Sequence, residues 1–379
     1  MSSQDTTAAS LEAARALVPA QLLAALESTE LPGYLVGGAV RDALLGIEEL
    51  GPDLDVAIEG ELDPVLDLLG VEDSRSHERF GTATVLLGDR PLDLARTRSE
   101  TYEHPGALPD VEPASILTDL ERRDFTINAI ALPLSGPPEL LDPHGGVADL
   151  TARKLRLIHP GSLLDDPTRA LRGARYAARL GLEPDAETRE LLALTDLTSV
   201  SAERVEAELL RIGGETEAVR AFGLLDEWGV LEIGDDCLAL MAEAAEYVQT
   251  EPWVRLVERP QLLATIATAQ PDALESASEL AAAPDDRPTP ELFELAAGRS
   301  DLELAIARAK GAEWLDRHVS EWRRVALTID GESLIAAGVD EGPDVGRGLR
   351  AALHARLDGS IGATPEEELG VALAAVEPR

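Results

Sequence analysis

The sequence is poor in several residue types, and some of these shortages exclude a class of protein. Cys237 is the only cysteine among 379 residues, which excludes a disulfide framework and a CxxC zinc site. Aromatic residues make up 3% of the chain, and its only lysines are Lys154 and Lys310. The histidines are scattered and show no HExxH spacing of a zinc protease. They are His77, His104, His144, His159, His318 and His354.

Long apolar runs are also missing. No apolar run reaches 18 residues, so we expect no transmembrane span and no membrane partner. The first ten residues, MSSQDTTAAS, have neither the basic nor the apolar segment of a secretory signal. The default expectation is therefore a cytoplasmic protein.

Positive charge is scarce. The chain has 33 basic and 71 acidic residues, which gives a net charge of −38. Such a surface repels phosphates and by itself argues against a nucleic-acid partner. The charge is uneven, however, because residues 1–150 and 213–379 each carry a net −19, whereas residues 151–212 hold ten charges of each sign. The central segment is therefore where we expect contacts with an anionic partner.

The apolar pattern changes character along the chain. The length suggests two or three domains, and 45% apolar residues suffice for several cores. The first 135 or so residues mix two periodicities, with helical spacing at 11–29 and 40–45 and strand patterns at 34–36, 54–58, 82–87 and 92–95. From about residue 150 the pattern is helical, with segments at 167–181, 186–195, 201–212 and 216–228. Clusters of Pro, Gly and Asp predict loops near 282–290 and 340–348.

A glycine pair marks the first candidate site. The segment Gly37-Gly38-Ala39-Val40-Arg41-Asp42 follows a predicted strand and opens a predicted helix. Two glycines let the backbone approach a phosphate closely, and a helix N-terminus offers free N–H groups to it. Arg41 would add a charge-assisted contact. The alternative is an ordinary strand-to-helix turn, and this motif alone leaves both interpretations open.

Two aspartates in a predicted strand form the second candidate site. Asp53 and Asp55 would point to one face, with Leu54 and Val56 on the other. Adjacent carboxylates repel each other unless a cation lies between them, and oxygen ligands favour magnesium. Asp93 shows the same alternation and is a candidate third acid. The alternative is a solvated strand edge in a very acidic protein.

The order of these and later motifs resembles a known family. A glycine turn followed by DxD resembles the nucleotidyltransferase superfamily, which includes DNA polymerase β. Five segments are similar, in order, to motifs of the class II tRNA nucleotidyltransferase and bacterial poly(A) polymerase family. They are YLVGGAVRDALLG at 34–46, ERRDFTINA at 121–129, LDPHGG at 141–146, DDPTRALRGARYA at 165–177 and SAERVEAEL at 201–209.

The resemblance implies a fold and a domain order. It implies an α+β chain with a polymerase-β-like nucleotidyltransferase head that contains a small mixed sheet. An elongated, all-helical neck, body and tail would follow. The implied boundaries are a catalytic head at 1–140, a base-recognising neck at 141–212, and a tRNA-binding body and tail at 213–379.

The resemblance also implies roles for residues. In the family, the glycine turn holds the triphosphate and the DxD pair binds two metal ions. The implied catalytic residues are Asp53, Asp55 and Asp93, with Asp53 and Asp55 as Mg²⁺ ligands. The implied nucleotide-binding residues are Gly37, Gly38, Arg41, Arg122, Arg123, Asp166, Arg169, Arg172 and Arg175. An alternative for Arg122 and Arg123 is that they form a surface pair beside Glu121 and Asp124. An alternative for Arg172, Arg175 and Arg179 is that they lie on a solvated helix face.

Base selection can be argued from hydrogen bonding at the start of one predicted helix. Asp166 suits the N-cap, Pro167 the first helical position, and Arg169 the same face three residues later. An aspartate accepts and an arginine donates, which matches the amino group and ring nitrogen of cytosine or adenine. Uracil and guanine reverse this pattern, so the pair would reject them without a nucleic-acid template. Asp165 stands where the family has glutamate, which leaves its role open.

The remaining features distinguish members of the family. The Phe80-Gly81-Thr82 segment and the acidic C-terminus resemble tRNA enzymes rather than poly(A) polymerases. We therefore expect addition of C, A or both to the tRNA 3′ end from CTP and ATP, with no DNA partner. In this family, CC-adding members have a shortened flexible loop before the RRDFT motif. The connection from Arg98 to Leu120 is not shortened, and the resemblance therefore favours CCA or A addition over CC addition. The alternative functions are those of a poly(A) polymerase, an inactive RNA-binding relative and a small-molecule nucleotidyltransferase. The sequence does not distinguish a monomer from a homodimer.

Overall fold

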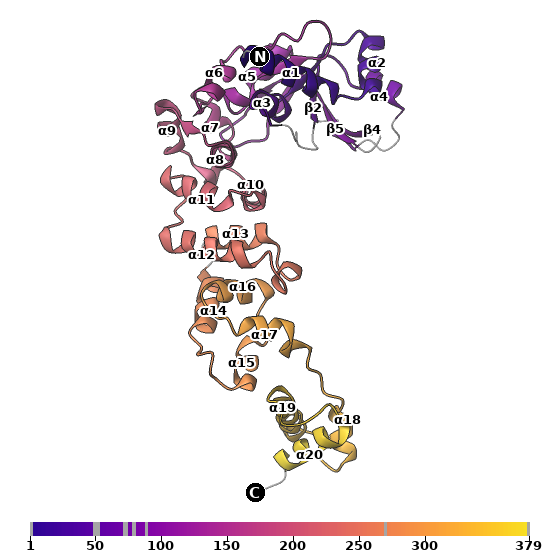
Figure 1. Cartoon of the computed structure of the whole chain (residues 1–379), viewed down its shortest axis with the longest axis vertical. Coiled ribbons are helices and arrows are strands. Elements are labelled where there is room, and N and C mark those ends of the chain that lie inside the picture. The colour runs from indigo at the N-terminus through magenta and orange to yellow at the C-terminus, as the bar shows by residue number, and fades with distance from the viewer. Residues whose placement is uncertain are drawn as a thin grey trace. The chain divides into compact units, whose positions relative to one another are not determined.

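The computed structural model describes residues 3–47, 54–70, 75–77, 81–87, 90–268 and 271–376. Asp53, one of the predicted metal ligands, lies outside these residues. The chain divides into two compact units, Met1–Glu232 and Ile233–Arg379 (Figure 1).

A mixed sheet forms the framework of the first unit. Its strand order is β3-β4-β5-β2-β1-β8, and β2 and β5 are parallel whereas all other neighbours are antiparallel. Leu54, Val56, Leu92 and Leu94 alternate into the core and fix the register of the parallel pair. The strands are β1 (Gly33–Val36), β2 (Leu54–Ile58), β3 (Arg75–His77), β4 (Thr82–Leu87), β5 (Arg90–Arg96) and β8 (Ala131–Pro133).

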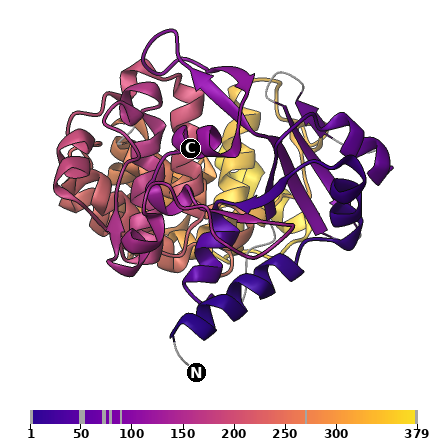
Figure 2. The same ribbon diagram turned by 90° about the horizontal axis from the view of Figure 1, so that it is seen from above.

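Helices pack around this sheet. The predicted helical stretch at 11–29 is divided, because Pro19 lacks an N–H and lies between two helices. The first of these, in indigo at the N-terminus in Figure 2, packs on the helix that follows the glycine turn. The helices are α1 (Ser3–Ala16), α2 (Ala20–Thr29), α3 (Gly38–Leu44), α4 (Asp63–Leu69) and α5 (Ile116–Glu121).

A hairpin leaves the sheet after β5. Its strands are β6 (Arg98–Thr101) and β7 (Asp110–Pro113), which the sequence analysis treated only as a connection. Gly106 lies between them with φ +73°, where a Cβ would be 2.4 Å from the Ser199 carbonyl oxygen. The Gly106 N–H donates to Leu164 O (3.2 Å), and its carbonyl accepts from Arg204 Nη1 (2.9 Å). The hairpin is therefore anchored on the helices that follow the sheet.

The rest of the first unit is helical apart from a parallel pair of two-residue strands, β9 (Lys154–Leu155) and β10 (Glu183–Pro184). Helix α8 packs against α10 and α11. Gly173 brings α8 close to the segment after α5, because a Cβ there would be 2.7 Å from Phe125 Cζ. The elements are η2 (Thr126–Asn128), α6 (Gly146–Thr151), α7 (Ser162–Asp165), α8 (Thr168–Leu180), α9 (Ala186–Leu192), η3 (Leu197–Ser199), α10 (Ala202–Gly214) and α11 (Ala218–Glu227).

The described residues of the second unit form helices and no strands. The loop predicted at 282–290 agrees with the connection between α14 and α15 as far as Pro288. The loop predicted at 340–348 agrees with a connection only as far as Gly342, because α19 begins at Pro343. Proline suits a first helical turn, and Gly348 lies where a Cβ would be 2.6 Å from Leu334 Cδ2, so glycine permits close helix packing. The elements are α12 (Asp235–Tyr247), η4 (Trp253–Arg255), α13 (Arg259–Ala267), α14 (Pro271–Ala281), α15 (Thr289–Ala296), α16 (Asp301–Ala309), α17 (Leu315–Ser320), η5 (Trp322–Arg324), α18 (Gly331–Ala336), α19 (Pro343–Leu357) and α20 (Pro365–Val376).

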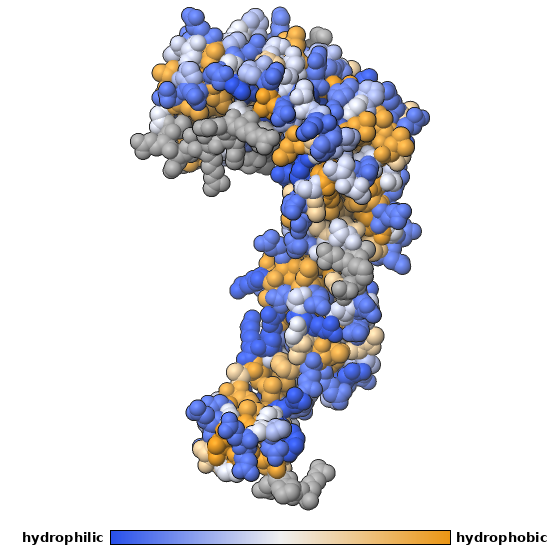
Figure 3. Space-filling model, turned by 180° about the vertical axis from the view of Figure 1, so that it is seen from behind, coloured by the Kyte–Doolittle hydropathy of each residue, from blue (hydrophilic) through white to orange (hydrophobic). Residues whose placement is uncertain are grey.

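The architecture confirms the expected α+β class, with a small mixed sheet followed by a mainly helical remainder. Figure 3 shows hydrophilic residues distributed over the visible face of both units, with smaller hydrophobic areas scattered among these hydrophilic residues. Within the described parts of the chain, no helix combines the length and the apolar character needed to cross a membrane.

Candidate active site

A cavity of about 990 Å³ in the first unit brings the predicted site residues together. Strands of the sheet, the base of the hairpin, the RRDF segment, α3, α8 and α10 all contribute to its wall. Every predicted site residue within the described ranges lines this cavity, and only Asp53 lies outside those ranges. The predicted residues that line the cavity are Gly37, Gly38, Arg41, Asp55, Asp93, Arg122, Arg123, Asp166, Arg169, Arg172 and Arg175.

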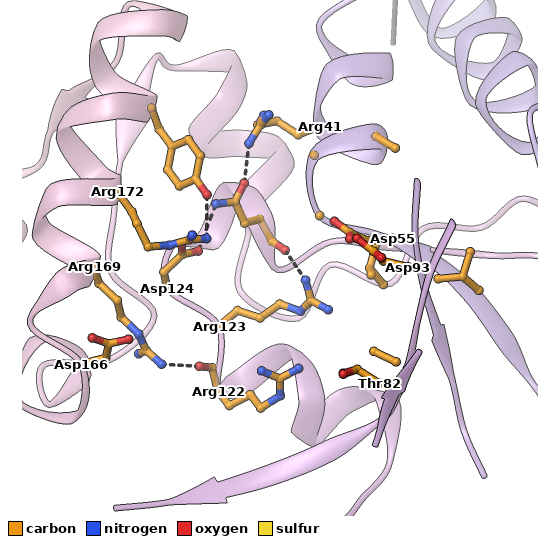
Figure 4. Close-up of a pocket in the computed structure, with 18 of the residues that line it drawn as sticks. Arg41, Asp55, Thr82, Asp93, Arg122, Arg123, Asp124, Asp166, Arg169 and Arg172 are labelled. Atoms are coloured by element: carbon orange, nitrogen blue, oxygen red, sulfur yellow. Dashed lines mark hydrogen bonds and ion pairs between the residues drawn. The ribbon is translucent and has the colours of Figure 1, made fainter. Parts of the chain in front are cut away.

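Two carboxylates lie side by side on the sheet wall of this cavity. Asp55 and Asp93 are paired in register across the parallel strands β2 and β5, and both are exposed whereas their strand neighbours are buried (Figure 4). Thr84 Oγ1 donates to Asp93 Oδ1 at 2.6 Å. Among the residues that the structure describes, no three His, Cys, Asp or Glu side chains gather as metal ligands; Asp53 is not one of those residues.

The glycine turn lies directly beside these acids. Gly37 has φ +69°, and a Cβ on it would be 3.3 Å from Asp55 Oδ2 and 3.6 Å from Arg123 Nη1. Glycine is therefore needed both for the backbone conformation and for the close approach. Gly38 is the first residue of α3.

Arg41 projects from α3 into the wall and is only 3% exposed. Its Nε donates to Asp42 Oδ1 (2.8 Å), its Nη1 donates to Asn128 Oδ1 (2.7 Å), and its guanidinium lies 5.3 Å from the centre of the Tyr176 ring. Its charge is thus already compensated within the protein, and its contact with phosphate stays a prediction.

The arginine pair of the RRDF segment is held by a residue that was not predicted as part of the site. Asp119, which is 1% exposed, accepts from Arg122 Nη2 (2.8 Å) and Arg123 Nη2 (3.0 Å). Burial alone would raise the pKa of the Asp119 carboxyl, but the charges of Arg123 and Arg122 outweigh burial and lower it. The arginines pair with this buried acid instead of Glu121 or Asp124. Its spacing of three and four residues was the available signal.

A second buried acid comes from the hairpin. Glu100 Oε1 accepts from Arg122 Nη1 (3.0 Å) and Arg98 Nη2 (2.8 Å), and Glu100 Oε2 accepts from the Tyr102 hydroxyl (2.7 Å). Burial opposes ionisation of Glu100, yet the charge of Arg122 and the bonds from Tyr102 and Arg98 lower its pKa. Burial and the neighbouring Glu100 charge raise the pKa of Tyr102, so its hydroxyl keeps its proton and remains a donor.

Asp124 connects the RRDF segment to α8. Its carboxylate accepts from Arg172 Nε (3.0 Å), from Asn128 Nδ2 (3.0 Å) and from its neighbour's backbone N–H (2.8 Å). Burial disfavours the charged form, but Arg172 and these hydrogen bonds lower the pKa of Asp124. Asn128 also accepts from Arg41, so this amide links α3 to the buried acid. It therefore orients the Arg41 and Asp124 side chains.

Two further arginines of α8 share one aromatic partner. The guanidinium groups of Arg172 and Arg175 lie 5.5 and 5.0 Å from the centre of the Tyr176 ring. Arg172 Nη2 donates to the Tyr176 hydroxyl (2.7 Å), and Arg175 Nη1 lies 3.3 Å from Glu215 Oε1. Arg172 and Arg175 therefore form part of the cavity wall and do not lie on a fully solvated helix face.

Asp166 organises the start of α8. The helix begins at Thr168, and Asp166 Oδ1 accepts from the Thr168 N–H (3.0 Å) and hydroxyl (2.6 Å). Pro167 and not Asp166 is the N-cap residue of α8, so both expected positions are off by one, although the Asp166 carboxylate still accepts from the Thr168 N–H. Arg204 Nη2 lies 2.9 Å from the same carboxylate oxygen, while Asp165 Oδ2 lies 3.7 Å from His159 Nε2.

Arg169 is fixed on the cavity wall and is only 6% exposed. Its Nη2 donates to the backbone oxygen of Arg122 at 2.7 Å (Figure 4). Its Nη1 donates to Ser162 Oγ at 2.6 Å. The RRDF segment and the start of α8 are therefore tied together through this guanidinium.

Comparison with known proteins identifies related chains. Residues 33–156 match the family described as poly A polymerase head domain. A CC-adding tRNA nucleotidyltransferase of Deinococcus radiodurans is 35% identical over 88% of this chain and 87% of its own length. An A-adding tRNA nucleotidyltransferase of Geobacter sulfurreducens is 30% identical over 92% of this chain, which spans only 45% of that longer protein.

Solved structures show the same architecture. A CCA-adding enzyme in an apo form superposes with a TM-score of 0.81 at 27% identity, covering 96% of this chain and 95% of that one. A CCA-adding enzyme in complex with ATP superposes with a TM-score of 0.75 at 26% identity, covering 97% and 95%. Nucleotidyl transfer in this polymerase-type family implies the use of a divalent metal ion. The ordered motifs, the mixed sheet and the similarity to full-length relatives show that the chain belongs to the tRNA nucleotidyltransferase and poly(A) polymerase family.

Proposed function

We propose that this protein adds C, A or both to the 3′ end of tRNA from CTP and ATP, without a nucleic-acid template and with release of pyrophosphate. One observation carries the proposal: a single cavity presents the Asp55–Asp93 pair at one end and Asp166 with Arg169 at the other (Figure 4). The first pair suits phosphoryl chemistry, and the second suits recognition of a base.

Base selection is assigned to Asp166 and Arg169. The carboxylate accepts from the amino group of cytosine or adenine, and the guanidinium donates to the neighbouring ring nitrogen. Uracil and guanine would leave a donor facing Arg169 and an acceptor facing Asp166, which costs binding free energy in a desolvated site. No second nucleic-acid strand is needed for this choice.

The phosphate end is assigned to the glycine turn and Arg123. Backbone N–H groups at Gly37 and Gly38 suit the triphosphate, because no side chain blocks its approach. Arg123 Nη1 lies next to the same turn and can offset the charge that develops on the leaving pyrophosphate. The tRNA 3′ oxygen then attacks the α-phosphorus in line with that leaving group.

The metal is proposed to be Mg²⁺, held by Asp53 and Asp55 with Asp93 as a further acid. The described part of the site fits such an ion, since Asp55 and Asp93 are adjacent carboxylates that face a polar cavity. When bound, Mg²⁺ lowers the pKa of the attacking hydroxyl and neutralises charge on the pyrophosphate. Thr84 orients Asp93 through its 2.6 Å hydrogen bond.

We also propose that the protein acts in the cytoplasm and that each part of the chain has its own role. Residues 1–140 would form the catalytic head, 141–212 the base-recognising neck, and 213–379 the tRNA-binding body and tail. The balanced charge of residues 151–212 supports contact between this region and the tRNA end. In the last part, Arg347 and Arg350 are exposed side chains available for phosphate contacts.

Two observations favour different specialised members. The connection from Arg98 to Leu120 is a complete hairpin followed by α5, which favours CCA or A addition. The CC-adding relative, in contrast, aligns with 88% of this chain, which favours CC addition. The two arguments predict different products, and these differ in which nucleotides and which tRNA 3′ ends the protein uses.

The test offers the protein three tRNA substrates, which lack the 3′ CCA, end in C, or end in CC, each with labelled CTP or ATP. Use of CTP on the first two and of ATP on the third would establish CCA addition. Use of CTP or ATP alone would establish the CC-adding or A-adding form. Long ATP tails on any RNA would instead identify a poly(A) polymerase, and the absence of metal-dependent incorporation would identify an inactive relative.

A further inference from the structure

The Arg169 guanidinium is fixed by groups from three separate segments. The two short bonds are those from Nη1 to Ser162 Oγ (2.6 Å) and from Nη2 to the Arg122 backbone oxygen (2.7 Å). Longer contacts join Nη1 to Ser162 O (3.4 Å) and Nη2 to the Tyr102 hydroxyl (3.5 Å). One short bond on each terminal nitrogen defines the plane of the guanidinium.

Ser162 is the only side-chain anchor among the two short bonds. It is fully buried, with 0% exposure. It is the first residue of α7, the short helix that ends immediately before Asp166. Its backbone oxygen accepts from the Asp166 N–H at 3.2 Å. Ser162 therefore touches both base-selecting residues, Arg169 through its hydroxyl and Asp166 through its main chain.

This contact matters because an arginine is a flexible donor. A guanidinium that is free to turn could donate to O4 of uracil or O6 of guanine as readily as to a ring nitrogen of cytosine or adenine. Rejection of uracil and guanine then requires that the donor direction be fixed before the base arrives. Anchoring the guanidinium before binding also removes the side-chain entropy that Arg169 would otherwise lose.

We propose that Ser162 is a positioning residue for nucleotide selection, which holds the Arg169 guanidinium in the plane that accepts C or A and rejects U or G. The proposal rests on the proposed function. It adds a residue outside the acid–arginine pair to the set that determines specificity.

The test compares Ser162→Ala with a matched control, Ser276→Ala. Ser276 is also buried and also accepts from an arginine Nη1 at 2.6 Å, in this case Arg299 of the second unit. Both variants lose a hydrogen bond of the same length from an arginine, and Ser276→Ala also loses the bond from Ser276 Oγ to Glu303 Oε1 (2.6 Å). A general effect of such losses on folding should therefore appear at least as strongly in the control. Ser162→Cys, which keeps the side-chain size but accepts hydrogen bonds weakly, is measured as a second variant.

The readout is the ratio of kcat/KM for CTP to that for UTP, and for ATP to that for GTP, on the tRNA that the wild-type protein extends. We expect Ser162→Ala and Ser162→Cys to lower these ratios about tenfold, with higher KM for the correct nucleotide. Ser276→Ala should keep the wild-type ratios even if its thermal midpoint falls. Wild-type ratios in a folded Ser162→Ala or Ser162→Cys variant would overturn the proposal.

The same experiment separates this inference from the proposed function. If the wild-type protein extends no tRNA or does not discriminate against UTP and GTP, the proposed function fails. If the wild type discriminates and the Ser162 variants discriminate equally well, the proposed function stands and only the role of Ser162 is refuted. If Ser162→Ala does not fold, the ratio measured for Ser162→Cys decides.

Discussion

Asp55 and Asp93 occupy paired positions on parallel strands, so the chain brings two carboxylates together from segments separated by 38 residues. We expect Asp53→Ala and Asp55→Ala each to lower nucleotide incorporation by more than about a hundredfold while tRNA binding is retained. Rates measured with labelled CTP or ATP and tRNA affinity measured by filter binding test this. Asp67→Ala, an exposed acid of α4, is the control and should behave as wild type. Incorporation within a few-fold of wild type in Asp55→Ala would refute the metal assignment.

Arg169 should be needed to reject the wrong bases. Arg169→Met removes every donor but keeps a long side chain, so UTP and GTP should be incorporated at a larger fraction of the CTP and ATP rates. Arg189→Met, on the exposed face of α9, provides the control. Unchanged rejection of UTP and GTP by Arg169→Met would contradict template-free selection by this residue.

Arg204 should act on the same selection through Asp166. Its side chain bonds both the Asp166 carboxylate (2.9 Å) and the Gly106 carbonyl (2.9 Å), so it connects the start of α8 with the hairpin. Arg204→Ala should raise KM for CTP and ATP about tenfold with a smaller change in kcat, because Asp166 loses one of its anchors. Steady-state kinetics at saturating tRNA measures this split. Equal KM values in variant and wild type would show that Asp166 is fixed without Arg204.

The buried acid Asp119 should contribute strongly to stability. Asp119→Ala leaves Arg122 and Arg123 without their shared partner in a largely buried position, and we expect a loss of about 3–5 kcal/mol in the free energy of unfolding. Urea unfolding measures this loss. Glu251→Ala, which breaks the exposed pair with Arg255, should cost less than about 0.5 kcal/mol. A similar cost for the two variants would contradict the structural role of Asp119.

Acid should destabilise the first unit through the same carboxylates. The folded-state pKa values of Asp119, Asp124 and Glu100 are lowered below those of the unfolded chain. Their contribution to stability is therefore complete above the ordinary carboxyl range, near pH 4, and is lost as the pH falls through the lower folded-state values. Unfolding free energies measured from pH 6 to pH 3 should decline less steeply in Asp119→Asn than in wild type. Parallel pH profiles would refute the assignment.

Two glycines within helices should respond oppositely to the same substitution. Gly173→Ala places a methyl group 2.7 Å from the Phe125 ring and should destabilise the protein by about 1–3 kcal/mol. Gly346→Ala, in α19, meets nothing within 4 Å and should stabilise by about 0.5–1 kcal/mol. Thermal unfolding of both variants measures the difference, and stabilisation by Gly173→Ala would contradict close packing of α8 on Phe125.

The strands and helices near the cavity were largely predictable because they carry clear periodicities. The alternation at Leu92–Ala95 and the strand pattern at Thr82–Leu87 correspond to β5 and β4, and the glycine turn lies where the sequence placed it. The hairpin formed by β6 and β7 was missed. Its strands have no apolar alternation and are held by Glu100 and the contacts of Gly106, which join residues far apart in the chain.

Most described site residues were identifiable as a set, but their partners were not. Motif resemblance pointed to Arg122 and Arg169, whereas the residues that hold them are less visible: Asp119 is marked only by its spacing from the arginine pair, and Ser162 by no signal in the sequence. A buried acid and a buried serine acquire meaning only when the fold brings a guanidinium within hydrogen-bond distance. Positions 343–348 show the same limit, since their glycines predict a loop unless the neighbouring helix is known.

The arginines that line the cavity have a final consequence for how nucleotide enters. Arg41, Arg122 and Arg172 each already bond an internal acid, so the triphosphate does not meet a row of bare positive charges. If the triphosphate binds these arginines as proposed, binding exchanges one ionic partner for another, and the protein itself neutralises little net charge. Such an exchange releases few counterions, so nucleotide affinity in this strongly acidic protein should depend only weakly on ionic strength.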